Sequence, residues 1–151
     1  MVRAMDLDIL RQVSEEFIPF NKLLGVRVVV LERGRAVAEI PFREELIGDP
    51  IKRVLHGGVI SALADTAGGM TVWSSLMNPE LRISTIDLRI DYLRPGQRET
   101  LIAEGTTLRV GRSVGVADIR LYQPSAPADT VATGRGVYVI KAPRSGPASR
   151  R

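Results

Sequence analysis

Helical periodicity marks the first part of the chain, between residues 6 and 24. Its apolar positions are spaced three or four residues apart: Leu7, Leu10, Val13, Phe17 and Phe20. This spacing places them on one face of an N-terminal helix. We expect the helix to end at Gly25, because glycine readily adopts the left-handed conformation that closes a helix.

Strand patterns follow this helix and return in the second half of the chain. The β-branched runs VRVVVLER and RAVAEIPF are separated by Arg33 and Gly34, which predicts a hairpin. Beyond residue 79 come four further runs: ISTIDLRIDYLRP, ETLIAEGTTLRV, SVGVADIRLYQP and TVATGRGVYVI. The first alternates, with Ile86, Leu88, Ile90 and Tyr92 on one face and Thr85, Asp87, Arg89 and Asp91 on the other. Short Gly or Pro turns join the four runs, which is typical of an antiparallel meander.

Between the two groups of strands lies the segment HGGVISALADTAGGMTVWSSLMNP, which is apolar nearly all round. This pattern predicts a helix at about 57–77 that protein encloses on most sides. An α+β fold satisfies the order of elements if a six-stranded antiparallel sheet wraps around the long helix. The 151 residues suit a single domain at 1–141, and the Arg-, Pro-, Gly- and Ser-rich segment 142–151 is expected to be disordered.

Composition narrows the chemistry. The chain has no cysteine, which excludes disulfides, thiolate metal sites and a cysteine nucleophile, and we expect neither a metal nor a cofactor. The net charge of +4 favours an anionic ligand without selecting nucleic acid, membrane or a phosphorylated cofactor. The first residues, MVRAMDLDILRQ, place acids where a secretory signal needs an apolar core, so we expect a cytoplasmic protein.

Asp65 stands out within the predicted central helix. Between Arg53 and Glu80 the only ionisable side chains are those of Asp65 and His56. Burying an unpaired carboxylate costs free energy or raises its pKa until it is neutral. An aspartate at this position therefore indicates either a hydrogen-bond partner or a function. Helical spacing places it on a face of small residues: Gly58, Ala62, Asp65 and Gly69. We expect the neighbouring face to pack against the sheet: Val59, Leu63, Met70 and Trp73.

The segment His56-Gly57-Gly58 begins the helix, and its free backbone N–H groups can stabilise developing negative charge. A thioester carbonyl becoming an oxyanion is such a charge, and Asp65 is positioned to supply a base or nucleophile. Structural alternatives remain open. Asp65 can be a hydrogen-bond partner in the core, His56 a cap, and the glycines a tight start of the helix. A membrane-spanning helix is disfavoured by the Gly and Ser content, the central Asp and the strands that follow.

The motif HGGVISALADTAGG followed by STIDLRIDYLRPG resembles the hotdog-fold thioesterases of the 4-hydroxybenzoyl-CoA superfamily, phenylacetic-acid-degradation type. The resemblance covers roughly residues 24–140. It implies that Asp65 is the nucleophile or general base of an acyl-CoA thioesterase and that the Gly57 N–H polarises the thioester carbonyl. It also implies that His56 shapes this end of the site and that Thr85 lies near the reacting water. Family members are dimers, many of them dimers of dimers, so Asp65 is expected to face the partner's Gly57.

The resemblance also implies which residues bind coenzyme A and which one replaces an asparagine common in the family. Coenzyme A phosphates would be bound by Arg94 and by the turn Gly111, Arg112 and Ser113, although these are also ordinary hairpin residues. Gly58 would also contact the substrate. Many relatives carry an asparagine shortly before the HGG motif, where this chain has Asp49 and Pro50, so Asp49 is a possible substitute. A second carboxylate near Asp65 would raise one of the two pKa values.

The acyl group is expected to lie against Ala62, Gly69, Met70 and Trp73. The expected partners are therefore an acyl- or aryl-CoA substrate and further copies of the chain, forming a homodimer or homotetramer, with no nucleic acid and no membrane. Two other functions stay open. One is a hotdog hydratase or dehydratase, whose catalytic histidine sits in a different motif. The other is a non-catalytic acyl-CoA-binding module, against which the presence of Asp65 argues.

Overall fold

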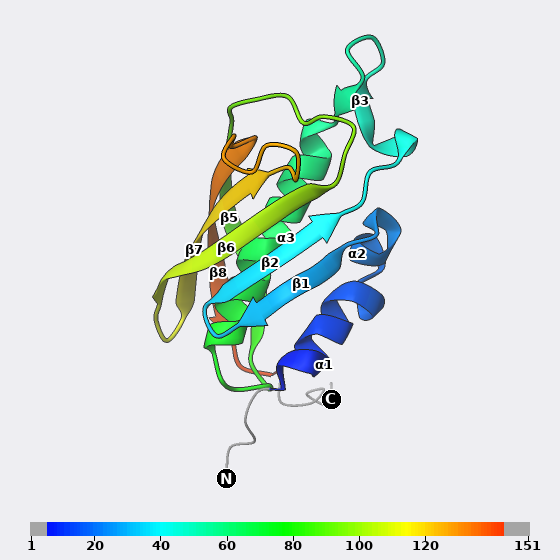
Figure 1. Ribbon diagram of the computed structural model, residues 1–151. Coiled ribbons are helices and arrows are strands. Elements are labelled where there is room, and N and C mark those ends of the chain that lie inside the picture. The colour runs from blue at the N-terminus through cyan, green and yellow to red at the C-terminus, as the bar shows by residue number, and fades with distance from the viewer. Residues whose placement is uncertain (1–5, 144–151) are drawn as a thin grey trace, which may run out of the picture.

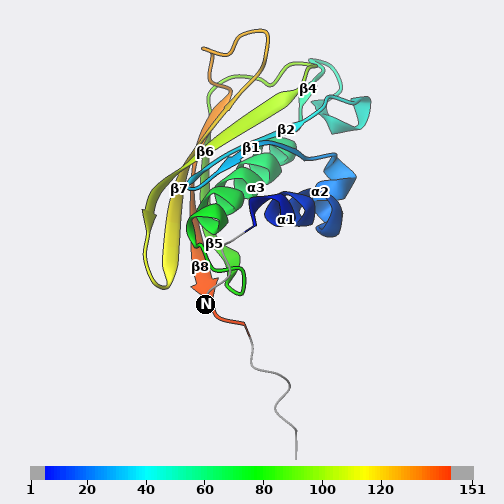
Figure 2. The same cartoon turned by 60° about the horizontal axis from the view of Figure 1, so that its bottom comes forward.

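A curved antiparallel sheet wraps around one long helix in the computed structural model, which describes residues 6–143 (Figure 1). The six strands follow the order β1-β2-β6-β7-β8-β5. Their bounds are β1 (Arg27–Glu32), β2 (Arg35–Ile40), β5 (Arg82–Tyr92), β6 (Leu101–Val110), β7 (Val114–Tyr122) and β8 (Ala132–Lys141). Helix α3 (Gly57–Ser75) lies against the concave face, as Figure 2 shows. The predicted hotdog architecture is confirmed.

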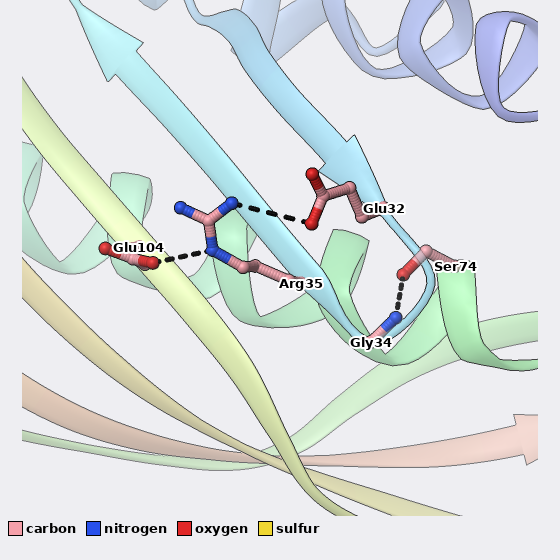
Figure 3. Close-up of polar contacts among 5 residues, drawn as sticks. All are labelled: Glu32, Gly34, Arg35, Ser74 and Glu104. Atoms are coloured by element: carbon pink, nitrogen blue, oxygen red, sulfur yellow. Dashed lines mark hydrogen bonds and ion pairs between the residues drawn. The ribbon is translucent and has the colours of Figure 1, made fainter.

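Smaller elements connect the hairpin β1–β2 to α3. The 3-10 turn η2 (Glu44–Leu46) leads into a two-stranded sheet of β3 (Ile47–Asp49) and β4 (Val54–Leu55). The hairpin turns at the predicted place, and Gly34 there has a φ of +79°. Its N–H donates to the Ser74 hydroxyl at 3.1 Å, which fastens the hairpin to the end of α3 (Figure 3). On the same hairpin Arg35 pairs with Glu104 and Glu32, which raises the pKa of its guanidinium.

The core lies between α3 and the sheet. Leu63 and Ala67 of the helix are fully buried and belong to the main apolar cluster with residues of β2, β6 and β7, and Val59 is buried there too. The backbone of the sheet comes very close to α3 at Gly105 and Gly115. A Cβ at Gly105 would overlap the Thr71 hydroxyl, and one at Gly115 would overlap Val72. These glycines therefore set how closely the helix packs.

The predicted N-terminal helical segment is present, but it is not one continuous helix over 6–24. The segment consists of α1 (Leu7–Gln12), the π-helical turn η1 (Val13–Phe17) and α2 (Pro19–Leu24), which ends at Gly25 as predicted. Pro19 is the cause, because a proline disfavours helical geometry at the residue before it, and Ile18 is extended at φ −91° and ψ 106°. The break changes the helical phase. Phe17 and Phe20 are 68% and 56% exposed, whereas Ser14 and Asn21 are buried.

The alternation predicted for β5 is also wrong in its first part. The pairing with β8 shifts register between Thr85 and Asp87, so Ile86 occupies a bulge and is 59% exposed. Thr85 and Tyr92, seven residues apart, both contact α3. Strict alternation would place them on opposite faces. The bulge therefore turns Thr85 toward the helix, an effect that bulges commonly have beside active sites.

The central helix ends at Ser75, two residues before the predicted end at 77. Most of the segment expected to be disordered, 142–151, lies outside the described residues. Within residues 6–143, no helix combines the length and apolar character that crossing a bilayer requires.

Candidate active site

Asp65 faces a cavity of about 320 Å³ that opens beside the middle of α3. The walls come from α3, the N-terminal segment, β5 and β8. All four residues expected to contact the acyl group line this cavity: Ala62, Gly69, Met70 and Trp73. Sequence reasoning missed the contributions of the other elements: Ser14, Ile18, Phe20, Asn21, Ile83 and Tyr138. The break at Pro19 explains part of the omission, because Asn21 follows the break and is buried.

The Asp65 carboxylate is only partly occupied by the protein. Its Oδ1 accepts a hydrogen bond from the Thr85 hydroxyl at 2.8 Å. Within residues 6–143 its Oδ2 has no hydrogen-bond partner, and the side chain is half-buried. A carboxylate that served only as a core hydrogen-bond acceptor would have both oxygens satisfied. The geometry therefore leaves one oxygen available to a molecule in the cavity.

The first turn of α3 offers one particular backbone donor. His56 is the N-cap, and its Nδ1 accepts from the Gly58 N–H at 2.8 Å. The His56 carbonyl accepts from the N–H groups of Val59 and Ile60 at 3.0 and 3.4 Å. In the described part of the chain the Gly57 N–H has no acceptor. His56 thus leaves Gly57 as the free donor at the start of the helix.

Tyr92 of β5 supports this turn and was not singled out from the sequence. Its hydroxyl donates to the Gly57 carbonyl at 3.2 Å and is hydrogen-bonded to the Ser61 hydroxyl. The ring also lies within 3.6 Å of where a Gly57 Cβ would be. Tyr92 therefore ties the edge strand to the end of the helix that carries the free N–H.

Asp65 and Gly57 are too far apart to meet one carbonyl within a single chain. They are separated by eight residues of α3, a rise of about 12 Å at 1.5 Å per residue. Both residues are half-buried, and between them Gly58 is exposed and Ala62 is half-buried. A second helix running antiparallel to this part of α3 would bring the two groups together.

Asp49 lies in a turn of its own rather than at the cavity. Its carboxylate accepts from the N–H groups of Ile51 and Lys52, both at 2.9 Å, and these bonds lower the pKa of Asp49. It is not among the residues that line the cavity around Asp65. The structure therefore does not bring these two carboxylates together in one chain.

The residues expected to bind coenzyme A do not form one cluster. Arg94 follows the end of β5, where Tyr92 pairs with Ala132, and its guanidinium lies 3.9 Å from Asp129. The turn containing Gly111, Arg112 and Ser113 lies at the other end of β8, where Ile140 donates to the Ser113 carbonyl. Eight residues of β8 separate the two places, about 26 Å along the strand. No group of His, Asp and Glu suited to hold a metal occurs in residues 6–143.

Comparison with known proteins yields consistent matches. The sequence profile of the thioesterase superfamily matches residues 53–126. The chain is 42% identical over 123 residues to the protein named "Putative esterase VNG_1336C" of Halobacterium salinarum, covering 78% of this chain and 81% of that protein. It is 36% identical over 130 residues to the medium/long-chain acyl-CoA thioesterase YigI of Escherichia coli, covering 75% and 83%. A crystal structure from Shewanella oneidensis, related to the thioesterase superfamily, superimposes with a TM-score of 0.82 at 28% identity, covering 89% and 95%.

Proposed function

Because the chain belongs to the thioesterase superfamily and is a thioester hydrolase, we propose that it hydrolyses acyl-coenzyme A with Asp65 as the catalytic carboxylate. One observation carries the proposal. Asp65 presents an unoccupied oxygen to a largely apolar cavity while Thr85 holds the other oxygen. A fixed carboxylate beside an apolar cavity suits attack on a carbonyl whose acyl chain fills that cavity.

The substrate class follows from the cavity and from the charge of the chain. The acyl or aryl group lies against Ala62, Gly69, Met70 and Trp73 in the cavity that Ile18 and Phe20 also line. The medium/long-chain activity named for YigI supports an acyl-CoA substrate. A net charge of +4 favours the anionic coenzyme.

The active site is shared between two copies of the chain. Gly57 and Asp65 are about 12 Å apart along α3, so a carbonyl beside Asp65 needs a hydrogen-bond donor other than Gly57 of the same chain. The α3 helix of a second subunit supplies this donor through its own Gly57 N–H. The surfaces for such a dimer are available. Strand β5 is an edge of the sheet; Ile86 within it and Leu93 directly after it are 59% and 58% exposed.

In the proposed reaction, the Gly57 N–H of the partner subunit and the Asp65 carboxylate have different tasks. The thioester carbonyl oxygen accepts a hydrogen bond from the N–H of the partner's Gly57, and this bond stabilises the oxyanion as it forms. With Asp65 as general base, Oδ2 removes a proton from water, and the resulting hydroxide adds to the carbonyl carbon. The tetrahedral intermediate then breaks its C–S bond, and the coenzyme A thiolate receives the proton. With Asp65 as nucleophile, the carboxylate displaces the thiolate first and water hydrolyses the mixed anhydride.

The test is thiol release from a panel of acyl-CoA thioesters by the wild type and by Asp65→Asn. We expect turnover to fall by about a hundredfold to ten-thousandfold, because a positioned acid–base group contributes on this scale, while substrate binding changes little. Asp118→Asn is the matched control, since Asp118 lies on the outer face and pairs with Arg135. It should retain activity.

Two results would contradict the proposal. Tight acyl-CoA binding without thiol release by the wild type would indicate a binding module. Thiol release that Asp65→Asn leaves unchanged would remove Asp65 from the mechanism.

A further inference from the structure

Tyr138 of β8 is the most deeply buried ionisable side chain at the cavity. Its side chain is 1% exposed, and it lies on the cavity wall beside Asp65. The phenol hydroxyl donates to the Asp65 backbone carbonyl at 3.0 Å. Burial raises the pKa of Tyr138, and the negative charge of Asp65 raises it further. The phenol therefore remains a hydrogen-bond donor.

Space for this ring is made by glycines on both elements that flank it. A Cβ at Gly68 of α3 or at Gly136 of β8 would overlap the phenol oxygen. At Gly69 a Cβ would lie 3.5 Å from the Tyr138 ring. The hydroxyl reaches the helix backbone only because these positions lack side chains. The packing thus fixes the phenol where it meets Asp65.

The register between β5 and β8 places Tyr138 beside Thr85. Tyr138 pairs directly with Thr85 across β8 and β5. The two hydroxyls reach the same residue from neighbouring strands, Thr85 at the carboxylate and Tyr138 at the main-chain carbonyl. One bond orients the side chain, and the other holds the turn of α3 from which that side chain projects.

We propose that Tyr138 is a positioning residue that holds the α3 backbone at Asp65 in register with Thr85, so that the free carboxylate oxygen faces the thioester. This role rests on the proposed thioesterase activity. It concerns the rate of the chemical step rather than binding, because the phenol contacts Asp65 and is itself sealed from solvent.

The test compares the kinetics of acyl-CoA hydrolysis by the wild type, Tyr138→Phe and the control Tyr122→Phe. Removing only the hydroxyl should lower kcat about twofold to tenfold, the equivalent of one hydrogen bond, and leave KM within about twofold. Tyr122 lies under Arg120, and its ring is not part of the cavity wall. Tyr122→Phe should therefore match the wild type.

A second comparison separates positioning from general stability. In an Asp65→Asn background, Tyr138→Phe should have no further effect on kcat, because residues that act through one another are not additive. If Tyr138→Phe does not fold, Gly136→Ala tests the same contact, since its Cβ displaces the phenol, and the same kcat loss is expected.

Failure of the proposed function and failure of the role of Tyr138 give different results. A wild type that releases no thiol overturns the proposed function and this inference with it. An active wild type whose kcat Tyr138→Phe leaves unchanged overturns this inference alone. So does a loss of kcat that is equally large in the Asp65→Asn background, because that result assigns Tyr138 a role independent of Asp65.

Discussion

In the proposed mechanism Gly57 contributes its backbone N–H, which has no acceptor within residues 6–143. His56 satisfies the N–H of Gly58 with its Nδ1 and those of Val59 and Ile60 with its carbonyl. The Gly57 N–H stays free at the positive end of the helix dipole, where the proposed mechanism places the thioester carbonyl. The cap formed by His56 thus determines which backbone N–H stays free at the start of α3.

The proposed role of the Gly57 N–H as a hydrogen-bond donor to the thioester can be tested with Gly57→Pro, which removes this N–H. Proline lacks the N–H, yet it is favoured at the first position of a helix, and His56 already has the extended conformation that a following proline requires. We expect kcat to fall by about a hundredfold to a thousandfold, as for loss of one oxyanion donor. Steady-state kinetics with an acyl-CoA would measure the change.

Gly57→Ala is the control for added bulk. Its Cβ would meet the Tyr92 ring at 3.5 Å, an ordinary contact, and it keeps the N–H. It should retain most of the activity. Equal losses in the two variants would contradict the role of the Gly57 N–H.

Asp65, Gly57 and Thr85 could be selected from the sequence because each stands in a recognisable motif, and the structure brings Thr85 to Asp65. Tyr138 and Tyr92 could not be selected. Each is an aromatic residue in a strand, and such residues are ordinarily core residues. Only the pairing of β5 with β8 and the closeness of α3 show that their hydroxyls meet the helix backbone.

Among the elements, the sheet and the central helix were predictable because their patterns are long and regular. The errors arose where one residue changes the phase of a pattern. Pro19 divides the N-terminal helix, and the bulge at Ile86 reverses the faces of β5. The proline was visible in the sequence, and its effect on Ile18 is a known one. A bulge has no comparable signal, because the register depends on the partner strand.

The packing of α3 on the sheet predicts a stability effect at Gly105. A methyl group there would meet the Thr71 hydroxyl and the Ala67 carbonyl. Gly105→Ala should therefore lower the free energy of unfolding by about 1–3 kcal/mol, the usual cost of overpacking. Urea denaturation would measure it.

Gly111→Ala serves as the control for this effect, since a Cβ there would lie 3.4 Å from the Val114 carbonyl oxygen and meet nothing else within 4 Å. Its free energy of unfolding should change by no more than about 0.5 kcal/mol. A stable Gly105→Ala variant would contradict the close packing of α3 on β6.

For the whole molecule, the proposed mechanism makes dimer formation a requirement for catalysis. The carboxylate and the free N–H lie about two turns apart on one helix, and one thioester carbonyl contacts both only if a second helix is present. In the single chain Gly58 of α3 is exposed, Ala62 is half-buried, and β5 is an edge strand of the sheet. Sequence patterns describe one chain, so they define these surfaces without showing what covers them.

Subunit complementation between Asp65→Asn and Gly57→Pro tests this shared site most directly. In a mixed dimer, one site carries both defects and the other carries neither. If two inactive variants are co-refolded in equal amounts, about half of the dimers are mixed, and thiol release should recover to about one quarter of the wild-type rate. Activity that stays at the level of the separate variants would contradict an active site built from Asp65 of one subunit and Gly57 of the other.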